Sequence, residues 1–206
     1  MEEMKKRLLI VIGVIVIILA GGFTVFRFQH KSTGMKISHT TDIVQKKQTN
    51  SKKRLIIYFS LSGSTEEAAK QIKADTGADI IRLQPQKAYP SGYDAYVKVA
   101  QKQLADKIHP AIRTKITNLD QYDTIFVGYP TWWHQPPMII HSLFEKFDFS
   151  GKTIVPFTTS MSDPVSRSMP DMRKLAKGDN AKIINGFRYD DNKKALAKFL
   201  NENDLN

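Results

Sequence analysis

Short apolar runs alternate with amphipathic segments along most of the chain. Five runs are typical of strands buried on both faces, at residues 55–59, 79–83, 124–128, 153–157 and 182–184. Each is followed by a segment with apolar residues three or four positions apart, which predicts helices at residues 64–74, 93–108, 138–147, 170–176 and 193–200. The alternation predicts an α/β domain with a five-stranded parallel sheet that is covered by helices on both faces. Five strands suit the known doubly wound order 2-1-3-4-5, which has a ligand crevice beyond the carboxyl ends of the strands.

A longer apolar stretch stands apart near the start of the chain. Residues 8–26 carry no charge and would span about 28 Å as a helix, which matches the hydrocarbon core of a bilayer. They follow a basic tail, residues 1–7, and precede a polar segment, residues 27–53, that indicates a flexible tether. We expect one transmembrane helix with membrane lipid as its partner, ahead of a domain at residues 54–206. A cleaved secretory signal is the alternative.

The charges that flank this stretch bear on its orientation. Basic residues at positions 5–7 favour a cytoplasmic N-terminus, although Arg27, Lys31 and Lys36 flank the other end. Because the tail ahead of the span is short, we predict a single-pass protein of the cell membrane whose domain is extracytoplasmic. Gly22 stands where a bacterial lipoprotein would carry its acylated cysteine, so lipidation there is excluded.

Composition excludes several kinds of chemistry. The chain has 206 residues and no cysteine, which excludes disulfides, thiolate metal sites and cysteine nucleophiles. Its five histidines show no metal-binding spacing, so no metal is predicted. The net charge of +11 is spread along the chain, with +6 in residues 51–206, and the sequence contains no basic block or zinc-finger pattern. We therefore predict no nucleic-acid partner.

The loop after the first predicted strand is rich in hydroxyl groups. Ser60, Ser62, Gly63, Ser64 and Thr65 lie where a strand leads into a helix, and a helix N-terminus attracts anions. The loop lacks the Gly-Lys-Ser/Thr ending of a P-loop and the G-x-G-x-x-G pattern, so neither ATP nor NAD is indicated. Capping of the helix would use a single hydroxyl, and the larger number present favours phosphate binding.

Two motifs resemble those of the flavodoxin-like family. Residues 56–72 fit the flavodoxin signature for the phosphate of FMN at each constrained position, and residues 129–133, Tyr-Pro-Thr-Trp-Trp, are similar to the Tyr-Pro-x-Trp-Trp loop of flavodoxin-like proteins. The resemblance extends from about Arg54 to Leu200. It implies the three-layer flavodoxin-like fold, with FMN as the cofactor.

Further cofactor contacts are expected in the loop after the third strand, at Pro130, Thr131, Trp132, Trp133 and His134. The two tryptophans are the only ones in the chain, and their rings would stack on the flat isoalloxazine of FMN. Packing beneath the loop is the alternative for each. The His134 side chain would either contact the flavin edge or be a solvated loop residue.

The loop after the fourth strand supplies the last candidates, which are Thr159, Ser160, Met161 and Ser162. Family members usually have a glycine-rich stretch here that closes over the flavin, whereas this chain has larger residues, namely Met161, Asp163 and Pro164. The Met161 thioether would press on the flavin ring or fill a gap beneath the loop.

Together these features predict a membrane-tethered FMN-binding protein that carries electrons or reduces a quinone-like acceptor. No G-x-S-x-G pattern or comparable hydrolytic set occurs, and no catalytic residue is predicted. As an enzyme it would be an FMN-dependent oxidoreductase of the NAD(P)H:quinone type. The alternative is an interaction module that has kept the fold and lost effective flavin binding. The +6 charge of the domain also predicts a raised potential for the last electron taken up by the flavin.

Overall fold

The structure, a computed structural model, describes residues 53–206. The predicted tail (1–7), anchor (8–26) and all but the last residue of the predicted tether (27–53) lie outside the described residues. From residue 53 to the end of the chain, none of the helices combines the length and the apolar character that crossing a bilayer requires.

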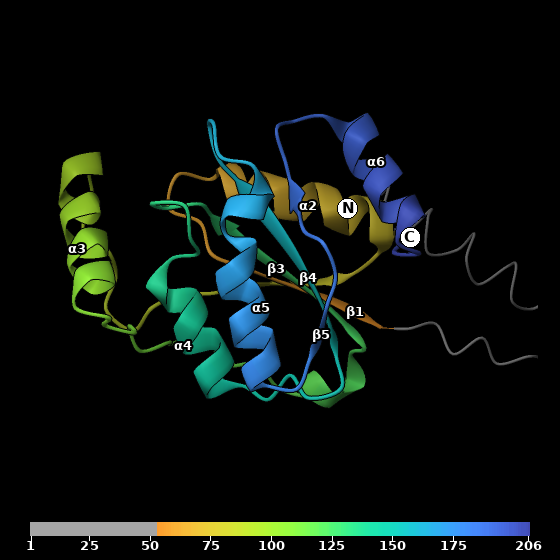
Figure 1. The fold of residues 1–206 in the computed structure, drawn as a ribbon, viewed down its shortest axis with the longest axis horizontal. Helices are drawn as coiled ribbons and strands as arrows, with labels where there is room; N and C mark the ends of the chain where they lie inside the picture. The colour runs from red at the N-terminus through yellow and green to blue at the C-terminus, as the bar shows by residue number, and fades with distance from the viewer. Residues whose placement is uncertain (1–52) are drawn as a thin grey trace, which may run out of the picture. The chain divides into compact units, whose positions relative to one another are not determined.

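A parallel sheet forms the middle layer of the domain (Figure 1). Its order is β2 (Asp79–Arg82), β1 (Arg54–Tyr58), β3 (Thr124–Pro130), β4 (Thr153–Thr159) and β5 (Lys182–Ile183), which confirms the predicted order 2-1-3-4-5. A sixth strand, β6 (Phe187–Arg188), was not predicted and also pairs with β4. The fifth position of the sheet is therefore shared by two short strands, because the chain departs from β4 between Ile183 and Phe187.

Two apolar cores, one on each face, explain why the strand sequences are continuously apolar. Alternate side chains of β1 point to opposite faces, so Leu55 and Ile57 join one core while Ile56 and Tyr58 join the other. The first core is covered by α4 (Met138–Lys146) and α5 (Met169–Gly178), and the second by α2 (Ser64–Thr76) and α6 (Lys193–Glu202). Helices on both faces make the predicted three-layer arrangement (Figure 1).

Helix α3 (Tyr93–Ala105) lies to one side of these layers (Figure 1). Ala100 is its single buried residue, so most of its surface remains accessible. The helix ends three residues before the predicted end at position 108. Two short 3₁₀ turns, Leu119–Gln121 and Val165–Arg167, complete the elements of the described region.

The aromatic ring of Phe157 on β4 requires a glycine opposite it on β3. Gly128 is paired with Phe157, whose buried ring covers the glycine. A Cβ atom placed on Gly128 would lie 2.1 Å from the Phe157 Cζ atom. This contact fixes the end of β3, from which the Tyr-Pro-Thr-Trp-Trp loop departs.

Candidate functional site

Three loops meet at the carboxyl edge of the sheet, where β1, β3 and β4 end. They surround a cavity of about 570 Å³. Its lining residues come from all three loops, from α2 and from the segment after β6, and they are Ser62, Ser64, Glu67, Pro130, Thr131, Trp132, Thr159, Ser160, Met161, Ser162, Asp163, Tyr189, Asp190 and Asp191. The three loops that the sequence singled out therefore lie together at this edge of the sheet.

The loop from β1 to α2 presents a helix N-terminus to this cavity. Gly63 adopts a φ of 98°, a left-handed turn that favours glycine, and its N–H donates to Ser60 Oγ at 3.1 Å. No side chain caps the helix, which begins at Ser64. Since the first N–H groups of a helix have no acceptor within it, this end offers donors and a partial positive charge to an anion.

The predicted hydroxyls of this loop divide into two groups. Ser62 and Ser64 line the cavity, with their Oγ atoms 3.4 Å apart. Ser60 is buried beneath the turn that it stabilises. Thr65 is also buried, and its Oγ1 lies 2.8 Å from Thr159 Oγ1, so this hydroxyl joins α2 to the end of β4. We conclude that two of the four hydroxyls face the cavity and two support the loop.

Arg82 supports the same loop from the edge strand β2, which sequence reasoning missed. Its guanidinium donates to the Ser60 carbonyl oxygen at 2.8 Å and lies 3.3 Å from Glu66 Oε2. The only signal in the sequence was an arginine interrupting an apolar run. Arg82 is not among the residues that line the cavity.

The loop after β3 makes a tight hairpin. Backbone hydrogen bonds join Trp132 and Gln135 in both directions, at 3.0 and 3.1 Å. The two residues between them, Trp133 and His134, have φ values of 46° and 66°. Positive φ at both central positions is usually met by Asn-Gly, so these side chains are held in a strained turn.

The two tryptophans have different surroundings. Trp132 lines the cavity and packs edge-on against Phe59, with ring centroids 5.7 Å apart, and against Tyr89, at 5.9 Å. Trp133 is 40% exposed and lies outside the set that lines the cavity. Of the two tryptophans, only Trp132 therefore lies at this cavity, and its stacking on a flavin stays a prediction. Its packing role, the alternative from the sequence, coexists with its place at the cavity.

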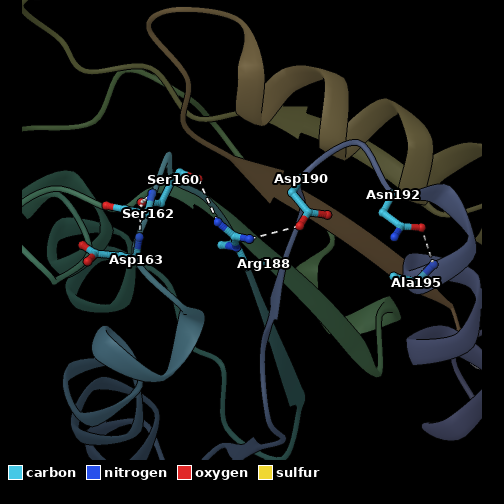
Figure 2. A network of polar contacts seen from close by, with 7 residues as sticks. All are labelled: Ser160, Ser162, Asp163, Arg188, Asp190, Asn192 and Ala195. Carbon is cyan, nitrogen blue, oxygen red and sulfur yellow. Dashed lines mark hydrogen bonds and ion pairs between the residues drawn. The ribbon is translucent and has the colours of Figure 1, made fainter.

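The loop after β4 is folded around one serine. Ser160 Oγ accepts hydrogen bonds from the N–H groups of Asp163, at 2.9 Å, and Ser162, at 3.3 Å (Figure 2). Asp163 also lies 2.9 Å from His134 Nδ1, which links the second and third loops. His134 does not line the cavity. The contacts of Asp163 with His134 and Ser160 give this larger residue a structural role at a position where a small residue was expected. Met161 is fully exposed at the cavity rim, so it does not fill a gap beneath the loop.

A fourth segment completes the cavity and was not foreseen. Tyr189, Asp190 and Asp191 follow β6, and Arg188 holds them by contacts to Asp190 Oδ2, at 3.0 Å, and to the Ser160 carbonyl oxygen, at 3.4 Å (Figure 2). Asn192 then caps α6 by accepting from the Ala195 N–H at 3.0 Å. A strand of two residues has no periodic signal in the sequence, which is why this segment was missed.

The local charge of the cavity is opposite in sign to that of the domain. Its lining includes four carboxylates, from Glu67, Asp163, Asp190 and Asp191, and no lysine or arginine. Charges beyond about 8–10 Å are largely screened, so the nearby carboxylates outweigh the +6 of the domain. The raised potential expected from net charge stays a prediction, and these lining carboxylates favour the opposite shift.

One buried polar atom at the cavity lacks a partner. Thr131 Oγ1, at the carboxyl end of β3, is inaccessible to solvent and makes no hydrogen bond within the described part of the chain. Buried polar groups in native proteins are nearly always paired. The hydroxyl thus has an unused donor and acceptor where a polar ligand would meet the second loop.

The comparisons with known proteins agree with this geometry. A family model described as flavodoxin matches residues 53–203. A protein of Bacteroides eggerthii DSM 20697, provisionally described as a flavoprotein, is similar in structure with a TM-score of 0.67 and 31% identity, covering 75% of this chain and 99% of its own. A comparable protein of Bacteroides uniformis ATCC 8492 gives 0.65 and 30%, covering 73% and 98%.

A more distant structure shares the fold. The flavoprotein of Lactobacillus acidophilus NCFM in complex with FMN has a TM-score of 0.59 and 22% identity, covering 71% of this chain and 99% of its own. A comparison with curated proteins gave no match. The family match spans more than half of the chain and agrees with the strand order and the site, and we conclude that this chain belongs to the flavodoxin family.

Proposed function

We propose that the cavity binds FMN with its phosphate at the N-terminus of α2. The observation that carries this proposal is an uncapped helix end, turned by Gly63, that presents Ser62 and Ser64 to the cavity. Backbone N–H and hydroxyl donors can neutralise a phosphate without lysine or arginine. The FMN complex of the Lactobacillus acidophilus flavoprotein, which has the same fold, supports this choice of ligand.

The walls of the cavity suit the flat ring system of the same ligand. Trp132 provides an aromatic face, the Thr131 hydroxyl provides a free hydrogen-bonding group, and the loop of residues 160–163 forms the opposite rim. Each aromatic partner adds roughly 0.5–1.5 kcal/mol beyond the burial of its area. Bound FMN would supply one- and two-electron chemistry, while these residues bind and orient it.

The four carboxylates that line the cavity bear on the reduction potential of a flavin bound there. They disfavour negative charge in the cavity, so they would oppose the anionic reduced form of a bound flavin and lower its potential. A low-potential flavin at an open edge of the sheet is suited to passing electrons outward. We infer that the protein is an electron carrier or a reductase for a quinone-like acceptor.

We extend the proposal to the rest of the chain. The uncharged stretch 8–26 would anchor the protein in the cell membrane, with the flavin domain on the extracytoplasmic side. Membrane fractionation tests the anchor, and protease treatment of intact cells tests the side. A domain that stays protected in intact cells, or a chain found in the soluble fraction, would contradict this part of the proposal.

An absorbance spectrum of the purified full-length chain in mild detergent tests flavin binding. We expect a yellow protein that releases FMN on denaturation. Ser64→Asp places a negative charge at the phosphate site and should weaken FMN binding at least about tenfold. Thr117→Asp adds the same charge at an exposed position before β3, outside the cavity, and serves as the matched control.

A colourless protein with no affinity for added FMN would overturn the proposal. The departures at Met161, Asp163 and Pro164 would then favour the alternative, an interaction module that has kept the fold. Equal FMN affinities for Ser64→Asp and Thr117→Asp would refute the phosphate position while leaving flavin binding intact.

A further inference from the structure

A second hollow lies beside the cavity, between α3 and the loop after β3. It has a volume of about 340 Å³, and we call it the aromatic groove. Its lining residues are Tyr93, Tyr96, Val97, Ala100, Gln101, Thr131, Trp132 and Trp133. Half of them are aromatic and none carries a formal charge, in contrast to the four carboxylates of the neighbouring cavity.

Two rings of the groove are exposed without a role in the proposed flavin site. Tyr93 is 71% exposed and Trp133 is 40% exposed, and neither lines the cavity. Trp133 is also held at a φ of 46°, a conformation that costs free energy for a bulky residue. Strained turns persist at sites where they serve ligand binding, and this one directs an aromatic side chain to the groove.

Contacts between the rings organise the walls of the groove in advance. Tyr96 stacks on Trp132 with centroids 6.1 Å apart and planes 19° from parallel. Tyr93 meets Tyr96 edge-on at 5.4 Å, and Trp133 meets Trp132 edge-on at 6.4 Å. Rings that support one another in this way lose little conformational freedom when a ligand binds.

We propose that the aromatic groove binds the planar ring of a quinone-class compound. This inference rests on the proposed function and adds the place where its quinone-like acceptor binds and the residues that hold it. An uncharged planar ring matches aromatic walls without charge, and its carbonyl oxygens can accept hydrogen bonds from the hydroxyls of Tyr93 and Tyr96 or from the Gln101 amide.

The groove is placed to bring such a ring close to the flavin. Thr131 and Trp132 line both hollows, so the Trp132 indole and one backbone segment separate them. A ligand in the groove would therefore lie against the same tryptophan that forms a wall of the cavity. This shared wall distinguishes the groove from a larger hollow on another side of α3, whose lining includes Tyr89, Val99 and Ile108 and neither tryptophan.

Calorimetric titration of the FMN-loaded full-length chain with menadione tests the inference, with detergent alone as the baseline. We expect Tyr93→Ala and Trp133→Asn each to weaken menadione binding about three- to tenfold. Asparagine accommodates positive φ, so the second variant removes the ring and keeps the turn. Val99→Ala alters an exposed side chain of α3 outside the groove and should leave the affinity unchanged.

The same variants separate this inference from the proposed function. FMN affinity, measured by the absorbance of bound flavin, should be the same in wild type, Tyr93→Ala and Trp133→Asn. If both variants lose FMN and menadione to the same extent, the groove belongs to the flavin and the inference is overturned. Menadione affinity that is equal in wild type and both variants also overturns it. If the chain binds no FMN but still binds menadione in a Tyr93- and Trp133-dependent way, the proposed function fails and the groove assignment stands.

Discussion

Substituting Gly128 by alanine should destabilise the domain through a single steric conflict. The added Cβ would lie 2.1, 2.5 and 2.7 Å from three atoms of the Phe157 ring, whereas an ordinary contact is above 3.4 Å. Phe157 is 1% exposed, so its ring has no space into which it can turn. Overpacking of a core typically costs 1–3 kcal/mol, and we expect a loss of about 3 kcal/mol because three ring atoms must move together.

Urea unfolding, followed by the fluorescence of Trp132 and Trp133, measures this loss as a change in the free energy of unfolding. Gly178→Ala is the matched control, since nothing lies within 4 Å of the Cβ that it adds at the end of α5, and it should be neutral or stabilise by up to about 1 kcal/mol. Phe157→Leu should recover part of the loss in the Gly128→Ala background. Equal effects of Gly128→Ala and Gly178→Ala would refute the reasoning.

Three further predictions concern particular side chains. The Tyr129 hydroxyl lies 3.0 Å from Ser168 Oγ, which itself donates to a backbone carbonyl. Tyr129→Phe should therefore lower the free energy of unfolding in urea by about 1 kcal/mol. An unchanged urea midpoint would contradict this. Burial, and then the charge of His109, lowers the pKa of His141 below its ordinary 6.5, so the folded chain binds fewer protons than the unfolded chain. The contribution of His141 to the free energy of unfolding should be fully present above about pH 6.5 and should be lost as the pH falls below it. His141→Gln should therefore reduce the difference between the free energies of unfolding measured by urea at about pH 7.5 and pH 5.5. Glu67 lines the proposed flavin cavity, so Glu67→Gln should tighten FMN binding about two- to threefold at low salt and less at high salt, as flavin fluorescence titration would show.

The presence of five parallel strands and the edge at which their loops meet followed from the sequence because both depend on local patterns. The order 2-1-3-4-5 was expected because it is a usual order of five-stranded doubly wound sheets. Runs such as Leu55–Phe59 are buried on two faces and therefore lack alternation, which distinguishes parallel strands without knowledge of their partners. Loops that leave the carboxyl ends of parallel strands meet at one edge, so the hydroxyl loop around Gly63 and the tryptophan loop had to be neighbours. The left-handed turn at position 63 was also indicated by the sequence, because glycine is the residue that best adopts a positive φ.

Tertiary structure decided which way the side chains of these loops point and what charge surrounds them. Thr65 is buried and does not line the cavity, and its hydroxyl is paired with that of Thr159, 94 positions later. Trp132 is held by the ring of Phe59, just after β1, and by the ring of Tyr96 in α3. The adjacent Trp133 is turned outward by two positive φ angles. The acidic side of the cavity depends on a two-residue strand that forms only because β4 offers it backbone partners. Such outcomes depend on contacts between residues distant in the chain, and a local pattern carries no record of them.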